Sequence, residues 1–223
     1  MKLVIGIGGS ILASPTINIG YIKRFADFLI KLHREQYKLM VVVGGGTIAR
    51  DYIQGARKLG ANDQLCDELG IASTRINAML LSAALGKYVN HPMPKVVKIP
   101  HDLSNILVMG GTKNGQTTDS VAAQIAFQVK ADLLLIASNV DGVYDCDPKI
   151  NPEASLFSKL NTSQLLRIVS KHKHTPGYEG IIDPLAAQLI HDKKIKTIVV
   201  NGNNLDNMRK SIKGFSYKGT LIN

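Results

Sequence analysis

The chain has little sulfur and little aromatic surface: its 223 residues include two cysteines, no tryptophan and 5% aromatic residues. Cys66 and Cys146 cannot build a disulfide framework and lack the spacing of zinc ligands, so we expect both to be small buried hydrophobic residues. No uninterrupted apolar run approaches the roughly 18 residues of a membrane span. The apolar start at Met1 to Gly6 is too short for a signal peptide, which favours a cytoplasmic protein.

Acidic residues are also in deficit. The chain has 27 lysines and arginines against 17 aspartates and glutamates, a formal net charge of +10. This excess favours an anionic partner. Because the basic residues are dispersed and aromatics are sparse, we expect neither nucleic acid nor a membrane as that partner, and small polyanions are the more economical interpretation.

What is present is an alternation of apolar strands with helical patterns. Strands are predicted at residues 3–7, 39–43, 95–99, 106–109, 133–137 and 197–200. Helices are predicted at about 19–36 and 47–58, from 63 onward, after 117–119, and at 182–191 and 205–212. The stretch between the predicted strand at 133–137 and residue 180 looks the least regular. The alternation predicts an α/β fold, a three-layer α/β/α sandwich around a mainly parallel central sheet, formed by residues 1–223 as a single domain.

Glycine-rich turns follow several of these strands directly. They are Gly8-Gly9-Ser10, Gly44-Gly45-Gly46, and the loop from Gly110 to Thr118, with Ser138 to Asp141 after a fourth strand. Ligands collect at the carboxyl ends of parallel strands, and backbone N–H groups at helix N-termini bind phosphate. Each turn also has a structural explanation, since glycine serves tight turns and Thr118 and Asp119 can cap a helix. Their joint occurrence favours a site for more than one phosphate.

Two common phosphate motifs do not fit these turns. The dinucleotide-binding fingerprint needs a glycine where Ile11 stands, and the P-loop needs a lysine after its last glycine, where Thr47 stands.

The turns together resemble the amino-acid kinase superfamily, and within it the uridylate kinases, most closely their archaeal branch. The resemblance follows the family's order over nearly the whole chain. It rests on Gly8-Gly9-Ser10, residues 44–50 (GGGTIAR), Gly110-Gly111-Thr112 with Thr117-Thr118-Asp119, residues 139–144 (NVDGVY), Asp147-Pro148 and residues 182–187 (IDPLAA).

The resemblance implies a kinase that transfers the γ-phosphoryl group of ATP to UMP, with Mg²⁺, in pyrimidine nucleotide biosynthesis. It implies a UMP-binding lobe at about 1–130 and an ATP-binding lobe at about 131–223, in a homohexamer assembled from dimers. The implied UMP-binding residues are Gly45, Asp67, Thr112, Lys113, Asn114, Gly115, Gln116, Thr117 and Thr118. Those facing the transferring phosphates are Gly9, Ser10, Gly46 and Arg50, and those lining the adenine and ribose are Ser138, Asn139, Tyr144 and Asp147. Arg50 is the candidate catalytic residue, and no side chain is assigned to the metal.

Several alternatives stay open. By pattern alone, Asp67 is a solvated charge on an amphipathic helix and Tyr144 a core residue with a surface hydroxyl. Many superfamily members have a lysine where Gly6 stands, which leaves Arg50, Mg²⁺ and backbone amides as candidate sources of positive charge.

The acceptor is open as well. It could be an isoprenoid phosphate, a carbamate or an amino-acid carboxylate, although isoprenoid-phosphate kinases carry a histidine that residues 47–51 lack. The third possibility is a non-catalytic protein that binds nucleotides or oxyanions.

Overall fold

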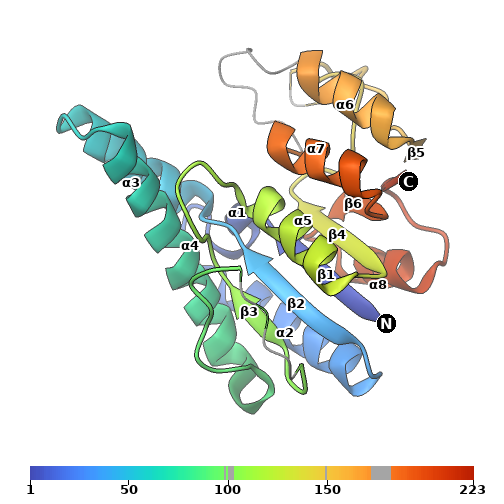
Figure 1. The fold of residues 1–223 in the computed structure, drawn as a ribbon, viewed down its shortest axis with the longest axis horizontal. Coiled ribbons are helices and arrows are strands. Elements are labelled where there is room, and N and C mark those ends of the chain that lie inside the picture. Colours follow the sequence, from blue (N-terminus) through green and yellow to red (C-terminus); the bar gives the residue numbers. More distant parts are fainter. Residues whose placement is uncertain (98, 100–102, 149, 172–181) are drawn as a thin grey trace.

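A seven-stranded sheet runs through the middle of the molecule (Figure 1). The computed structural model describes residues 1–223 except 98, 100–102, 149 and 172–181. The strands are β1 (Lys2–Ile7), β2 (Lys38–Val43), β3 (Leu107–Met109), β4 (Leu133–Ser138), β5 (Lys159–Leu160), β6 (Thr197–Asn201) and β7 (Thr220–Ile222). Their order is β3-β2-β1-β4-β6-β7-β5. Strands β3, β2, β1, β4 and β6 are parallel to their neighbours in that row, β5 is parallel to β7, and β7 alone is antiparallel to β6 among the described strands. The predicted mainly parallel sheet is confirmed.

Helices cover both faces of the sheet, which confirms the predicted three layers (Figure 1). One face is covered by α2 (Ile19–Arg34), α4 (Asp63–Leu85) and α8 (Leu205–Lys213), and the other by α5 (Thr118–Val129), α6 (Thr162–Lys171) and α7 (Pro184–Lys193). The remaining helices are α1 (Gly9–Leu12), α3 (Gly46–Lys58), which packs on α4, and the 3₁₀ turn η1 (Gly86–Tyr88).

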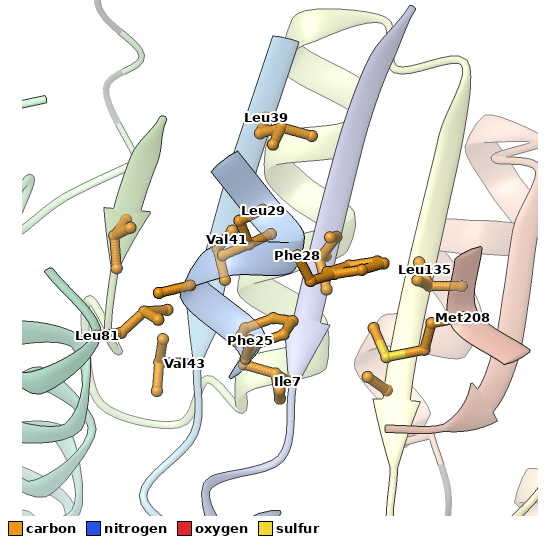
Figure 2. Packing of buried hydrophobic residues seen from close by; sticks show 14 of the residues in the cluster. Ile7, Phe25, Phe28, Leu29, Leu39, Val41, Val43, Leu81, Leu135 and Met208 are labelled. Carbon is orange, nitrogen blue, oxygen red and sulfur yellow. The ribbon is translucent and has the colours of Figure 1, made fainter. Parts of the chain in front are cut away.

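Successive side chains of a strand point to opposite faces of the sheet, so the core consists of two clusters, one on each face. In β1, Leu3, Ile5 and Ile7 join the cluster beneath α2, while Val4 joins the cluster beneath α5. Figure 2 shows Phe25 of α2 lying over Ile7, with Leu29 close to Val41 of β2. Gly6 faces the α5 side, where a Cβ atom would lie 3.4 Å from the Cβ of Ala122.

Two predictions about secondary structure were wrong. Residues 95–97 of the predicted strand 95–99 form bends, and Val96 is exposed. Val89 pairs with Ile106 at that place instead, so the edge position is already taken. The stretch to residue 180 is not irregular throughout, because α6 forms there and buries Leu165 in the core.

The prediction for the two cysteines holds for one of them. Cys66 is buried, whereas Cys146 is partly exposed and its thiol lies 3.4 Å from both Asp145 Oδ1 and Asn151 Nδ2. Polar neighbours in a turn therefore hold Cys146, and it is not a core residue.

In the described part of the chain, one helical stretch, residues 63–88, is long and apolar enough to cross a membrane by length and composition alone. A core helix of a soluble protein passes the same test. Since α4 buries Ala78, Leu81 and Leu85 in the core, the stretch is weak evidence for a membrane span.

Phe25 is expected to be among the most costly core residues to truncate. It is 0% exposed, and its ring stacks 5.8 Å from Tyr21 and 6.0 Å from Phe28. Phe25→Ala should lower the free energy of unfolding by about 3–5 kcal/mol, because a cavity remains under α2. Urea denaturation at one fixed protein concentration measures this. Phe215→Ala, which truncates a ring that is 64% exposed, should change stability by less than about 1 kcal/mol, and equal losses in the two variants would contradict the assignment of the core.

Candidate active site

A cavity of about 360 Å³ opens at the carboxyl ends of β1, β2 and β4. Neighbouring parallel strands end at the same edge of a sheet, so the turns that follow them meet there. The lining residues are Gly8, Gly9, Ser10, Ile11, Gly44, Gly45, Gly46, Arg50, Thr117, Thr118, Asp119, Ser138, Asn139 and Asp183. The structure thus brings together nine residues named from the sequence: Gly9, Ser10, Gly45, Gly46, Arg50, Thr117, Thr118, Ser138 and Asn139.

The first two glycine turns touch through their main chains. A Cβ atom on Gly9 would lie 2.3 Å from both the carbonyl oxygen of Gly44 and the nitrogen of Gly46. Gly46 also has a φ of +67°, a conformation that residues with a side chain rarely adopt. These glycines therefore do more than turn the chain, because they allow the ends of β1 and β2 to approach each other.

The N-terminus of α3 faces the cavity without a side-chain cap. Its N-cap residue is Gly45, and no side chain accepts a hydrogen bond from the first turn. The first N–H groups of a helix have no partner within the helix, and the dipole makes this end positive. This end of α3 is consequently suited to an anion.

Arg50 adds a full positive charge to the same side of the cavity. It lies early in α3, and its Nη2 donates long hydrogen bonds to Ser10 Oγ (3.3 Å) and Thr47 Oγ1 (3.4 Å). The side chain is exposed and extends toward the first glycine turn. A guanidinium in this position can donate two parallel hydrogen bonds to a phosphate group.

Two carboxylates that were not among the predicted site residues, Asp119 and Asp183, also line the cavity. Asp183 caps α7 by accepting hydrogen bonds from Leu185 N (2.9 Å) and Ala186 N (3.0 Å), and it also accepts one from the Thr117 hydroxyl. Asp119 accepts no hydrogen bond from any described residue. Burial, and after it the charge of Asp183, raises the pKa of the Asp119 carboxyl to about 7.

Gly6 lies directly beside Asp119. A Cβ atom at Gly6 would stand 3.6 Å from Asp119 Oδ1, so a long basic side chain at this place would meet the carboxylate. The sequence did contain a signal for both acids, since Asp119 ends the Thr-Thr-Asp motif and Asp183 belongs to the Ile-Asp-Pro motif. The sequence also allowed Thr118 and Asp119 to cap a helix, but the N-cap of α5 is Thr117, whose hydroxyl accepts a hydrogen bond of 3.1 Å from Ser120 N.

The loop that precedes α5 lies beside the cavity and outside its lining. Its predicted residues are Thr112, Lys113, Asn114, Gly115 and Gln116. Thr112 Oγ1 donates to Gln116 Oε1 at 2.8 Å, which closes the loop on itself. Asp67 of α4 accepts a hydrogen bond of 3.0 Å from Gly115 N, so the predicted acidic residue and the predicted loop are joined.

Tyr144 and Asp147 are not brought into the cavity. Both belong to the segment after β4, where Tyr144 bridges to Leu156 and the Asp147 carbonyl accepts from Asn151 N at 2.9 Å. Close packing of Gly142 against Thr220 carries this segment toward β7. Their role stays a prediction.

Comparison with known proteins places this geometry in a family. The model described as the amino acid kinase family matches residues 1–201. The uridylate kinase of Methanococcus aeolicus is 42% identical over 227 residues, covering 100% of both chains. The uridylate kinase of Thermococcus kodakarensis is 42% identical over 226 residues, covering 100% of this chain and 99% of its own.

Solved structures agree with the sequence comparison. The crystal structure of uridylate kinase from Archaeoglobus fulgidus matches with a TM-score of 0.83 at 41% identity, covering 100% of both chains. An aspartate kinase from Synechocystis, 19% identical, matches with a TM-score of 0.75 over 99% of this chain and 39% of its own, which is a likeness of fold alone. By both sequence and structure, the chain belongs to the amino acid kinase family.

Proposed function

We propose that the protein is a uridylate kinase, which transfers the γ-phosphoryl group of ATP to UMP and releases UDP and ADP. The observation that carries the proposal is the meeting of three glycine- or hydroxyl-rich turns at one cavity, from β1, β2 and the start of α5. The relatives named uridylate kinase, 42% identical over the full chain, support this acceptor over the alternatives considered from the sequence. A cytoplasmic enzyme of pyrimidine nucleotide biosynthesis fits the same proposal.

The proposal divides the chain into two lobes. The part at about 1–130 binds UMP through Gly45, Asp67 and residues 112–118, and the part at about 131–223 binds ATP. In the second part Ser138 and Asn139 line the cavity, while Tyr144 and Asp147 would contact the nucleotide outside it. Gly9, Ser10, Gly46 and Arg50 line the cavity, and in this proposal they face the transferring phosphates.

The chemistry asks for alignment and charge stabilisation. A phosphate oxygen of UMP forms the new bond to the γ-phosphorus while the bond to the bridging oxygen of ADP breaks, and ADP leaves with that electron pair. The phosphate of UMP is largely ionised at neutral pH, so the acceptor needs no general base. The uncapped N-terminus of α3 and the Arg50 guanidinium supply hydrogen-bond donors where negative charge gathers.

Mg²⁺ is the metal that the family resemblance implies, and the donor set fits it. Asp119 and Asp183 offer carboxylate oxygens at the cavity, and Mg²⁺ is usually held by one or two carboxylates together with substrate phosphates and water. Within the described residues there is no group of three or more His, Cys, Asp or Glu side chains that could hold a metal by itself. The ion, when bound, would neutralise phosphate charge, and these two aspartates would hold it.

The acceptor assay tests the proposal. Purified protein with Mg-ATP should convert UMP to UDP, with kcat/KM for UMP at least about tenfold above that for CMP, AMP or GMP, because a site built for one base rejects others. Arg50→Gln is the matched control for contaminating kinases and should lower kcat by about 10²-fold. Preferential turnover of another acceptor would show that UMP is not the physiological acceptor. Tight ATP binding without phosphoryl transfer would favour a non-catalytic protein.

The Asp119 carboxyl generates a pH prediction. Its pKa of about 7 in the folded protein lies above the ordinary 3.8, so between these values the folded state keeps a proton that the unfolded chain has lost. Asp119 therefore destabilises the folded state increasingly as pH rises through this window. In EDTA, Asp119→Asn should raise Tm above that of the unmodified protein at pH 8 by at least about 2 °C, and the difference should vanish toward pH 4.

Two comparisons sharpen this measurement by thermal denaturation. Asp27→Asn, which removes an exposed carboxylate from α2, controls for the change in net charge. Addition of Mg²⁺ with a nucleotide should narrow the difference at pH 8, because a cation favours the ionised carboxylate. A difference that does not change with pH would contradict the raised pKa.

The proposed assembly is a homohexamer built from dimers, and the outer face of α3 and α4 supports a dimer contact there (Figure 1). Tyr52, Leu59 and Met79 are 59%, 89% and 61% exposed, and an apolar groove of about 440 Å³ runs between the two helices. Glycine destabilises the middle of a helix relative to alanine. Nothing in the described part of the chain explains Gly55 of α3, because a Cβ atom there would meet no other atom. A second copy packing antiparallel across Gly55 would approach closely and would bring Asp51 of each copy toward Lys58 of the other.

Leu59→Arg tests this contact. Because Leu59 is 89% exposed, the variant should fold normally but sediment with less mass than the unmodified protein, whose expected mass is about six times 24.2 kDa. Analytical ultracentrifugation gives the mass directly. Phe215→Arg, at a ring that is 64% exposed and lies just after the end of α8, is the control and should leave the assembly intact. An unchanged mass for Leu59→Arg would exclude this face as the interface.

A further inference from the structure

Helix α4 supports the turn after β2 and the loop before α5 through the polar side chains of Thr74, Arg75 and Asn77. Asn77 Nδ2 donates to the carbonyl oxygens of Gly44 (2.9 Å) and Gly45 (3.1 Å). Thr74 Oγ1 accepts a hydrogen bond of 2.6 Å from Gly111 N. One face of this helix therefore fixes the turn after β2 and the start of the loop that leads to α5.

Arg75 makes the most extensive of these contacts. Its Nε donates to the Gly111 carbonyl at 3.1 Å, and its Nη2 donates to the carbonyls of Thr112 (3.3 Å) and Lys95 (3.2 Å). In the part of the chain that the structure describes, Arg75 has no carboxylate partner. The guanidinium is thus used to tie main-chain carbonyls together and forms no ion pair.

The loop at residues 111–116 depends on such side-chain contacts. No main-chain hydrogen bond joins these residues to another described element. Its attachments are side chains of α4: Arg75 donates to the loop, while Thr74 and Asp67 accept from Gly111 N and Gly115 N. The residue before the loop packs closely against α4, since a Cβ atom on Gly110 would lie 2.7 Å from Arg75 N.

We propose that Arg75 is a positioning residue that holds loop 111–116 against α4 in the conformation that receives the acceptor nucleotide. The inference rests on the proposed function for the identity of that acceptor, UMP. Arginine suits the task because its planar, rigid fork of donors can serve several carbonyls at once, whereas a lysine ammonium is a flexible point charge. Since Arg75 touches the loop and not the turns from β1 or β4, its loss should affect the acceptor and spare ATP.

Steady-state kinetics of Arg75→Met and Arg75→Lys test the role. Arg75→Met should raise KM for UMP about ten- to a hundredfold, while KM for ATP and kcat change by less than about threefold, because a loosened loop costs affinity that is made before the transfer step. Arg75→Lys should recover part of the lost affinity. Arg34→Met is the matched control, since Arg34 donates to the Tyr88 hydroxyl (2.8 Å) and should leave all three constants unchanged.

Hydrogen–deuterium exchange gives a readout that needs no activity. Amides of residues 111–116 should exchange at least about tenfold faster in Arg75→Met than in the unmodified protein, with α5 and β1 unaffected. If UMP is not a substrate but the loop exchanges faster, the proposed function fails and the loop-holding role stands. If UMP is a substrate and neither its KM nor the loop exchange responds, the role of Arg75 is overturned. Should Arg75→Met not fold, Arg75→Lys decides by the same two criteria.

Discussion

The main-chain contact between the first two glycine turns is the constraint on which the candidate site depends. With any side chain at Gly9, its Cβ atom would be 2.3 Å from backbone atoms of Gly44 and Gly46, so the ends of β1 and β2 would have to separate. The uncapped N-terminus of α3 would then no longer face Ser10 across the same cavity. Asn77 completes the arrangement by drawing the carbonyls of Gly44 and Gly45 toward α4. The cavity is therefore a product of backbone proximity, and the side chains around it refine its charge.

Much of the fold could be predicted from the sequence because its central strands are buried on both faces. Apolar runs such as 39–43 leave little choice of structure, and they are followed by turn residues. The exceptions lie at the edge of the sheet and among short elements. Residues 95–97 contain the apolar Val96 but find no strand to pair with, because Val89 already pairs with Ile106. Strand β7 is three residues long and pairs antiparallel with β6, a long-range choice that no local pattern specifies.

The part of the candidate site that the backbone determines could be predicted from the sequence. The hydrogen bonds among its side chains could be predicted less well. Gly9, Gly46 and Thr118 follow strands or open helices, so topology alone brings them together. The task of Arg75 depends on carbonyls of Gly111 and Thr112, more than 30 residues further along the chain, and such partners leave no periodic signal. A carbonyl exists at every residue, and only the folded chain selects which of them an arginine reaches.

The charges of the cavity fit the cation that the proposed function requires. Its lining holds Arg50 against two carboxylates, Asp119 and Asp183, an unfavourable balance for receiving several phosphates. Where many family members have a lysine, this chain has Gly6, beside Asp119 and without a charge. Burial and Asp183 then favour a proton on Asp119 in the absence of metal. In the proposed reaction, a cation held by Asp119 and Asp183 would favour the ionised form of Asp119, so Mg²⁺ and nucleotide should assist each other at this site.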